Sequence, residues 1–209
     1  MATQAIDDRV REREQSIVAR PPQIPPLKKS ELSEEAWTYT AEFMKAAGLP
    51  PEGDLKDDHI ATMLRHPDLL RVHTALALFL MSNGALLPRD RELAVLRTAW
   101  LCGSPYEWGE HVALGKRLAG LTSEEIARAR VGSAAEDLND HDRTIFRAVE
   151  EMHEDAKISD ETWAALAKDL DYQQLLELPI LIGQYQGVAY LLNSARIRMN
   201  EGNPGFSAR

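Results

Sequence analysis

Apolar positions recur three and four residues apart along most of this chain, which is the spacing of one face of an α-helix. Leu93, Leu96 and Trp100 follow this spacing in one segment, and Ile145 and Val149 follow it in another. The sequence contains no alternating, β-branched run of strand length. The pattern therefore predicts an all-α fold, built as a single-domain helical bundle.

Capping residues, prolines and glycines indicate where the predicted helices begin and end. Proline is well suited to the first turn of a helix, and glycine to the position just after the last turn. The segments that we expect to be helical run from Ser33 to Gly48, through Ile60 to Leu64, from Pro67 to Gly84, from Arg89 to Leu101, from Ser104 to Gly120, from Thr122 through Ile126, from Asn139 or Asp140 through Met152, from Ser159 through Leu170, and from Leu175 to Leu192 with an interruption at Pro179.

The two ends of the chain differ in composition from the middle. Residues 1–18 are rich in charge and could form an isolated helix, and the segment RPPQIPP then fixes an extended connector. We expect an arm with a Pro-rich connector over residues 1–29, which becomes ordered against a partner subunit. One helical domain follows over residues 30–200. The tail over residues 201–209 has no periodicity, and we expect it on the surface or across a neighbouring subunit.

Composition excludes several classes of partner. A net charge of -9 over 209 residues opposes binding to nucleic acid or to an anionic membrane surface. Cys102 is the only cysteine, so it has no partner for an internal disulfide, and the first residues lack the apolar core of a signal peptide. The longest apolar run, around residues 76–81, is too short to cross a bilayer. We therefore predict a cytoplasmic protein that is not embedded in a membrane.

The segment RDRELAVLRTAWLCGSPYEWGEHVALGKRLAG, residues 89–120, carries the chemistry. Glu107 and His111 are four residues apart, so on one helix their side chains share a face and can touch. A carboxylate beside an imidazole stabilises the imidazolium, raises its pKa and fixes its tautomer, which suits proton transfer near neutral pH. An antiparallel return after Gly103 would bring Glu92 opposite this pair. The sequence thus predicts an acid–base site of Glu92, Glu107 and His111.

At these residues the chain resembles the carboxymuconolactone decarboxylase and alkyl hydroperoxidase D-like (AhpD-like) family. The peroxidase branch of that family has a glutamate on one helix and Cys-x-x-Cys-x-x-x-His at the start of the next. Glu92 and His111 match the glutamate and the histidine, while the two cysteine positions fall on Ser104 and Glu107. The resemblance covers about residues 30–200, through HPDLLRVHTAL, LPRDREL, GLTSEE and IGQYQGVAYLLN. Because the redox pair is absent, the chain is more similar to the non-redox branch that includes the decarboxylase.

This resemblance implies a cofactor-free acid–base enzyme, a lyase or isomerase that acts on a small organic acid or lactone in the degradation of aromatic compounds. His111 would move the proton, Glu107 would orient it, and Glu92 would support the pair or act as a second acid. The remaining residues expected at the substrate are Ser104, Tyr106 and Trp108. The resemblance also implies a homo-oligomer, a trimer or a hexamer.

Other interpretations of the same residues stay open. Ser104, followed by Pro105 and then Glu107, also fits a capping box, and for Ser104 we favour that role. A Glu–His pair four residues apart is commonly a surface ion pair. The histidines have no recognisable ligand spacing, so we expect no metal. Cys102 fits a packed apolar residue at a helix end better than a reactive thiolate.

Two arginines, Arg91 and Arg97, are expected to be solvated, although one of them could hold a substrate carboxylate. Two functions from other classes also remain as alternatives. One is a thiol peroxidase or its reductase partner, which the absent Cys-x-x-Cys disfavours. The other is a ligand-binding or oligomeric scaffold without turnover. A pocket that holds the side chains of Glu92, Glu107 and His111 together would favour the enzyme, and solvent-exposed side chains that point apart would favour the scaffold.

Overall fold

The computed structural model describes residues 2–46 and 57–209, and within these ranges the chain forms helices and turns without a β-strand. The predicted all-α fold is confirmed, although the expected stop at Gly48 lies outside the described residues. The α-helices are α1 (Ala2–Val18), α2 (Glu34–Ala46), α3 (Asp58–Met63), α4 (Pro67–Ser82), α5 (Pro88–Leu101), α6 (Pro105–Ala119), α7 (Ser123–Val131), α8 (Asp140–Asp155), α9 (Asp160–Leu166) and α10 (Tyr172–Ala195). Short 3₁₀ turns are η1 (Lys29–Glu31), η2 (Gly132–Ala134) and η3 (Gly205–Ser207).

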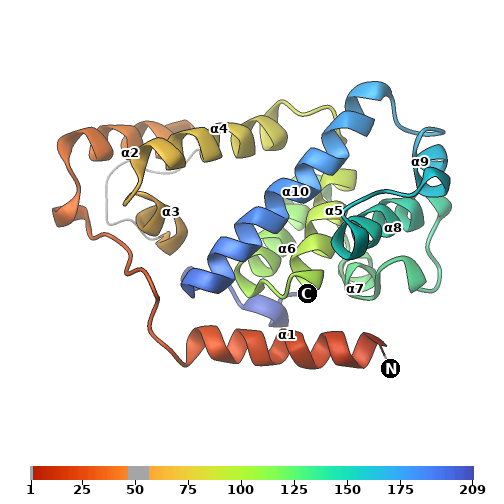
Figure 1. The fold of residues 1–209 in the computed structure, drawn as a ribbon, viewed down its shortest axis with the longest axis horizontal. Coiled ribbons are helices and arrows are strands. Elements are labelled where there is room, and N and C mark those ends of the chain that lie inside the picture. The colour runs from red at the N-terminus through yellow and green to blue at the C-terminus, as the bar shows by residue number, and fades with distance from the viewer. Residues whose placement is uncertain (1, 47–56) are drawn as a thin grey trace.

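Helix α5 is the centre of the bundle. It packs against α6, α7, α8 and α10, and the ribbon in Figure 1 shows α10 crossing in front of it. Every residue from Asp90 to Leu101 is buried, so no side of the helix after its first turn faces water. Buried charges are costly unless they are paired. The acidic and basic residues of α5 must therefore find partners inside the protein, and this requirement places the candidate site.

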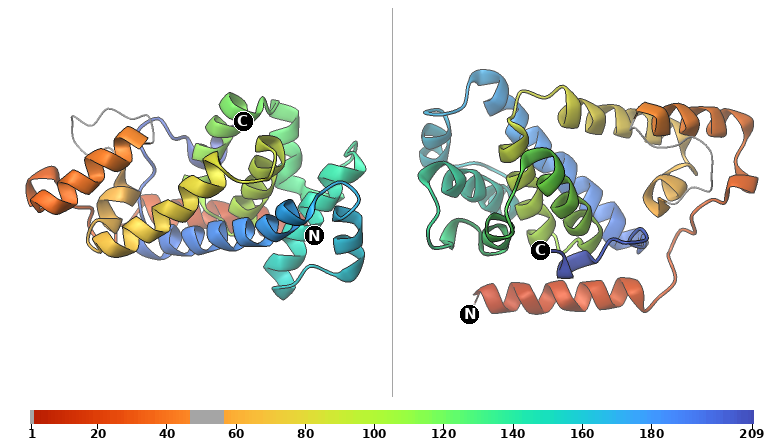
Figure 2. Two further views of the ribbon diagram at one scale, coloured as in Figure 1. Left: turned by 90° about the horizontal axis from the view of Figure 1, so that it is seen from above. Right: turned by 180° about the vertical axis from the view of Figure 1, so that it is seen from behind.

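Helices α2, α3 and α4 form a smaller unit beside the bundle. Ala36, Ile60, Leu64 and Leu70 make a separate apolar cluster there. Figure 1 and the view from above in Figure 2 show α2 and α4 extending away from the remaining helices. The main core lies instead around α5, α8 and α10.

The N-terminal helix α1 packs against its own chain. Val10 and Ile17, seven residues apart and thus on one face, are 1% and 2% exposed. Arg9 donates a hydrogen bond to the carbonyl oxygen of Leu101, at the end of α5. The expectation that the arm becomes ordered only against a partner subunit is therefore wrong. The segment is so rich in charged residues that its sequence does not reveal the buried apolar face, to which Val10 and Ile17 belong.

The C-terminal tail is anchored to the bundle by three buried residues, Gly205, Phe206 and Ala208. Phe206 is 7% exposed and its ring packs against Trp100, with 5.2 Å between the ring centroids. The backbone N–H of Phe206 donates to Glu14 of α1 at 3.2 Å, and the view from behind in Figure 2 shows α1 beside this end of the chain. Most of the tail lies on the surface as expected, and the expectation is wrong only for the buried residues around Phe206. A single aromatic residue gives no periodicity, so the pattern could not reveal its burial.

Helix α10 runs without a break through Pro179, where the sequence predicts an interruption. Proline removes one backbone hydrogen bond, but tertiary packing of the following turns can hold the helix together. Leu178, Leu181 and Ile182 are at most 1% exposed. By length and composition alone α10 could also cross a membrane. Its burial along one face is the environment of a core helix.

Candidate functional site

A tight turn joins α5 to α6 and sets the site. Gly103 adopts a positive φ of 61°, which glycine tolerates without strain, and the backbone N–H of Ser104 donates to the carbonyl oxygen of Ala99 at 2.9 Å. Pro105 then begins α6. This turn reverses the chain, so that α6 returns along α5, as the sequence predicts.

Glu92 of α5 and His111 of α6 meet across this pair of helices. The Nδ1 atom of His111 lies 2.7 Å from Oε2 of Glu92, and the two side chains belong to residues that are 6% and 0% exposed. The predicted proximity of Glu92 and His111 is confirmed.

Arg91 completes this buried cluster. Its Nε donates to Oε1 of Glu92 at 3.1 Å, and its Nη1 donates to the carbonyl oxygen of Met81 at 3.0 Å. Arg91 is 4% exposed, and Arg97 is 5% exposed with a bond to Glu150 at 3.0 Å. The expectation that these two arginines are solvated is therefore wrong, because α5 is enclosed on all sides.

Electrostatics favour the charged forms of Glu92 and His111. Burial alone raises the pKa of Glu92, but the hydrogen bonds and charges of His111 and Arg91 hold it below its ordinary value. Burial likewise opposes the charging of His111, yet the Glu92 carboxylate outweighs this and raises its pKa. With Nδ1–H donating to Glu92, the tautomer is fixed and Nε2 is the ring nitrogen left for a substrate.

Glu107 lies in the same region but has a different environment. It is 5% exposed, and its Oε2 atom is buried without a hydrogen-bond partner among the described residues. Burial raises the pKa of Glu107 to about 7, even though the charge of His111 acts in the opposite direction. Nδ1 of His111 is bonded to Glu92, so Glu107 does not orient the imidazole as the sequence suggests. Glu107 is instead a carboxyl group poised between its two protonation states.

Ser104 does not act as the helix cap that its sequence context favours. Its backbone has the extended conformation of an N-cap residue, but the side chain makes no cap hydrogen bond. Glu107 cannot complete a capping box, because the Ser104 N–H already donates to Ala99 in the turn. The Oγ atom of Ser104 is fully buried and has no partner among the described residues. Ser104 and Glu107 therefore place two unsatisfied polar atoms in the first turn of α6.

Tyr106 and Trp108, both expected at the substrate, make structural contacts instead. The hydroxyl of Tyr106 donates to Asp57 at 3.0 Å and accepts from Asn200 at 2.8 Å. Trp108 is fully buried, and its ring lies 5.0 Å from that of Trp100. Their positions next to Glu107 in the sequence placed them near the site, but helix geometry turns them toward the tail and the core.

Tyr185 of α10 is a neighbour of the site that residue spacing did not identify. Its ring meets the His111 ring edge to face, with centroids 4.8 Å apart, and its hydroxyl lies 3.3 Å from Sδ of Met81. Burial raises the pKa of Tyr185 well above its ordinary value, so it stays neutral. The segment IGQYQGVAYLLN already contains this residue, but only the fold brings it to His111.

Cys102 has the environment of an unreactive thiol. Burial raises its pKa to about 12, so the thiolate is scarce at neutral pH. It is buried beside the α5–α6 turn, as the packing interpretation expects. Within residues 2–46 and 57–209, histidine, cysteine and acidic side chains form no group of three arranged to hold a metal ion.

Comparisons with known proteins agree with this arrangement. Residues 67–151 match the Carboxymuconolactone decarboxylase family, and this range contains Glu92, Glu107 and His111. No curated protein matches the sequence significantly.

Solved structures share the fold at low sequence identity. An uncharacterized peroxidase-related protein from Ralstonia eutropha JMP134, with an AhpD core, aligns with a TM-score of 0.72 at 16% identity and covers 87% of this chain and 94% of its own. A protein of unknown function from Agrobacterium tumefaciens, named after the antioxidant defence protein AhpD, gives 0.60 at 18%, over 66% and 94%. The debrominase Bmp8 gives 0.63 at 14%, over 85% and 91%. The chain therefore matches the Carboxymuconolactone decarboxylase family over residues 67–151, has the AhpD-like helical fold, and, with a single cysteine, lacks the Cys-x-x-Cys pair.

Proposed function

We propose that this protein is a cofactor-free acid–base enzyme that decarboxylates a small organic acid or lactone, or catalyses a related lyase or isomerase step. One observation carries the proposal. A histidine whose tautomer is fixed by a buried carboxylate lies in the same enclosed region as a second carboxyl group, Glu107, with a pKa of about 7 and an oxygen that has no hydrogen-bond partner among the described residues. Acid–base sites typically have such environments, which shift the pKa values of neighbouring titratable groups away from their ordinary values.

Each group has a distinct role in this proposal. Glu92 and Arg91 hold His111, which offers Nε2–H to the substrate carboxylate or to a developing oxyanion. Glu107 is the second proton carrier, and in its neutral form it donates to carbon or oxygen. Ser104 supplies a hydroxyl without another partner, which can hold a polar substrate group. This assignment exchanges the parts that the sequence suggests for Glu92 and Glu107.

The chemistry of decarboxylation needs few groups. When the bond to the carboxylate breaks, its electron pair passes into the conjugated lactone system and carbon dioxide leaves. A proton from Glu107 or His111 then adds to carbon, and water restores the donor. The protein has to orient the substrate, exclude water and deliver one proton. Glu107 and His111 are 5% and 6% exposed and Glu92 is fully buried, so the three groups lie in a region from which water is largely excluded.

The proposal is tested with a panel of carboxylactones and small unsaturated acids, with carbon dioxide release and deuterium incorporation at carbon as the readouts. In His111→Asn we expect turnover to fall by about a hundredfold to ten-thousandfold, the usual effect of losing a positioned acid or base. His141→Asn is the matched control, because His141 lies in an ion-pair cluster with Asp90 and Asp169 outside the site.

His111 is buried and paired, so its loss also lowers stability. Turnover is therefore compared at a temperature where both variants remain folded by circular dichroism. Full activity in folded His111→Asn would refute the mechanism and leave a binding scaffold as the better interpretation. Turnover that disappears in Cys102→Ser would instead indicate the peroxidase alternative.

We also propose that the enzyme is cytoplasmic and forms a homo-oligomer, a trimer or a hexamer. The outer face of α10 supports the second part, because Tyr172, Leu176, Ile180 and Tyr190 are between 55% and 87% exposed. A stripe of large apolar side chains in water is typical of a subunit contact. Light scattering across a range of concentrations measures the assembly, and a constant mass of 23.4 kDa would contradict it.

A further inference from the structure

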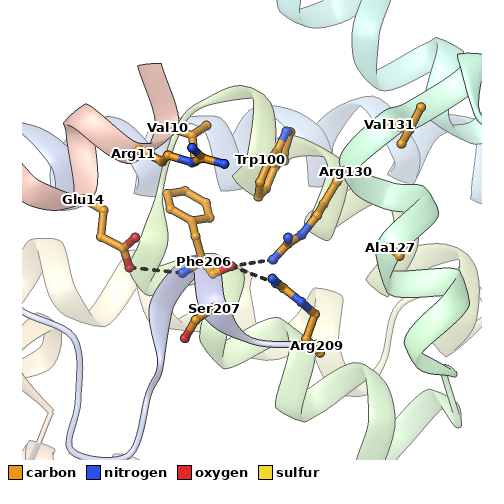
Figure 3. Close-up of a pocket in the computed structure, with 10 residues that line it drawn as sticks. All are labelled: Val10, Arg11, Glu14, Trp100, Ala127, Arg130, Val131, Phe206, Ser207 and Arg209. Carbon is orange, nitrogen blue, oxygen red and sulfur yellow. Dashed lines mark hydrogen bonds between the residues drawn. The ribbon is translucent and has the colours of Figure 1, made fainter. Parts of the chain in front are cut away.

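A concave site lies between α1, α7 and the C-terminal tail. It has a volume of about 420 Å³, within the range of small-molecule sites. Figure 3 shows its lining, which includes Arg11 and Glu14 of α1, Trp100 of α5, Arg130 of α7, and Phe206 and Arg209 of the tail. Glu92, Glu107 and His111 are not among the residues that line it, so it is separate from the candidate site.

Charge distinguishes this cavity from the rest of the molecule. Its lining has three arginines and one glutamate, whereas the whole chain has a net charge of -9. The glutamate, Glu14, is engaged by the backbone N–H of Phe206 at 3.2 Å. The cavity therefore presents a positive potential in an acidic protein, and such a local field attracts anions.

The arginines are held in different ways. Arg130 and Arg209 donate to the carbonyl oxygen of Phe206, and Figure 3 shows both directed toward it. The guanidinium of Arg130 also lies over the Trp100 ring at 4.7 Å. Arg11 enters from α1, is exposed, and makes no hydrogen bond or ion pair with the residues that the structure describes. Two arginines are thus fixed by the fold, and Arg11 keeps all its donors for a ligand.

The apolar part of the lining narrows the class of anion. Edges of Trp100 and Phe206 and the side chain of Val131, which is 43% exposed, border the cavity. A bare phosphate or sulfate ion would leave these surfaces uncovered, whereas an aromatic ring would cover them. A carboxylate matches the planar fork of a guanidinium. We propose that this cavity binds a small aromatic carboxylate, with Arg11 holding the carboxylate group.

Isothermal titration calorimetry with benzoate tests this proposal. Benzyl alcohol, which keeps the ring without the charge, and inorganic phosphate, which keeps the charge without the ring, should both bind at least about tenfold more weakly than benzoate. In Arg11→Gln benzoate affinity should fall about tenfold, and in the control Arg117→Gln, which makes the same charge change on an exposed part of α6, it should stay unchanged.

The candidate acid–base site could also accept benzoate, so His111→Asn locates the binding. Affinity that persists in His111→Asn and falls in Arg11→Gln supports the cavity between α1, α7 and the tail. Affinity that falls in His111→Asn and persists in Arg11→Gln would place benzoate at the acid–base site and overturn the proposal. Phosphate that binds as tightly as benzoate would overturn it as well, since the cavity would then recognise charge alone. None of these results depends on turnover, so the proposal can fail while the proposed function stands.

Discussion

Two clusters of charged residues start from the same stretch of α5 and differ in nearly every other respect. Arg89 makes two hydrogen bonds to Asp142, at 2.6 and 2.7 Å, and two to Glu125, at 2.7 and 3.2 Å, and its side chain is 34% exposed. Two residues later, Arg91 and Glu92 are enclosed with His111. The first cluster is paired and partly hydrated, and the second is dry.

The difference shows what separates a structural network from a candidate site. Arg89, Glu125 and Asp142 join the starts of α5, α7 and α8, and because Arg89 donates to both carboxylates, the three helices are fixed relative to one another. In the dry cluster Glu107 shares the region with Glu92, and burial pushes its pKa to about 7. Both places combine an arginine with carboxylates, and the buried one adds His111. In the buried cluster, burial and an oxygen without a hydrogen-bond partner among the described residues leave Glu107 able to gain or lose a proton near neutral pH.

The largest effect that would test this distinction concerns Glu107. Glu107→Gln keeps the shape of the neutral acid but cannot release a proton, so we expect turnover to fall by about a hundredfold or more. If Glu107 acts as the acid, the activity of the unmodified protein decreases as pH rises through about 7, and the variant lacks that limb. The measurement is the pH profile of kcat/KM for both proteins.

Stability provides a check on Glu107 that needs no substrate. Its pKa is higher in the folded state than the ordinary value of 4.5, so the folded protein holds this proton more tightly and becomes less stable as pH rises between about 4.5 and 7. Glu107→Gln should remove this part of the pH dependence in urea unfolding, whereas Glu125→Gln should not. An unchanged pH dependence in Glu107→Gln would contradict the buried, neutral carboxyl group.

An intermediate effect is expected in the hydrated cluster. Arg89→Met leaves Asp142 and Glu125 without their partner, and we expect it to lower the free energy of unfolding by about 2 kcal/mol, a usual value for hydrogen bonds to charged groups. Turnover should stay within about twofold, because this cluster does not bear on proton transfer. Urea unfolding measures the stability, with the exposed Arg117→Met as control. A loss of turnover in Arg89→Met without a loss of stability would contradict the structural role that we assign to this cluster.

The smallest effect is expected at Ser104. Because its hydroxyl is buried and makes no cap hydrogen bond, Ser104→Ala should change the free energy of unfolding by no more than about 0.5 kcal/mol. Thr122→Ala should cost about 1 kcal/mol, since Thr122 accepts a cap hydrogen bond from the N–H of Glu125 at 3.2 Å. Thermal unfolding compares the two variants. Equal losses would indicate that Ser104 caps α6 after all.

The sequence predicts the helices well because each has a local signal. Thr122 and Glu125 form the expected capping box, and Asn139 caps α8 as proposed. The Glu92–His111 contact is also predictable, because a tight turn at Gly103 makes the two helices run antiparallel and side by side. Burial of α5 on all sides is not predictable in this way. Its charged residues resemble a solvated face until α8 and α10 cover them.

Contacts between distant parts of the chain cannot be predicted from the spacing of apolar residues, for the same reason. Tyr185 reaches His111 only because α10 packs along α5, and Phe206 reaches Trp100 only because the tail turns back to the bundle. The residues next to Tyr185 and Phe206 in the sequence give no indication of these contacts. The role of Ser104 was also misjudged because the backbone bond from its N–H to Ala99, which competes with a capping box, is a property of the turn.

The hydrogen bond between Glu14 and Phe206 joins residues that are 192 positions apart. Closing so long a loop has an entropic cost that slows folding, so contacts of this kind usually form after local ones. We therefore expect α1 to dock last during folding, when the helical bundle already exists. A chain emerging from the ribosome would keep α1 undocked until Phe206 has been made, with Trp100 and its neighbours uncovered in the meantime.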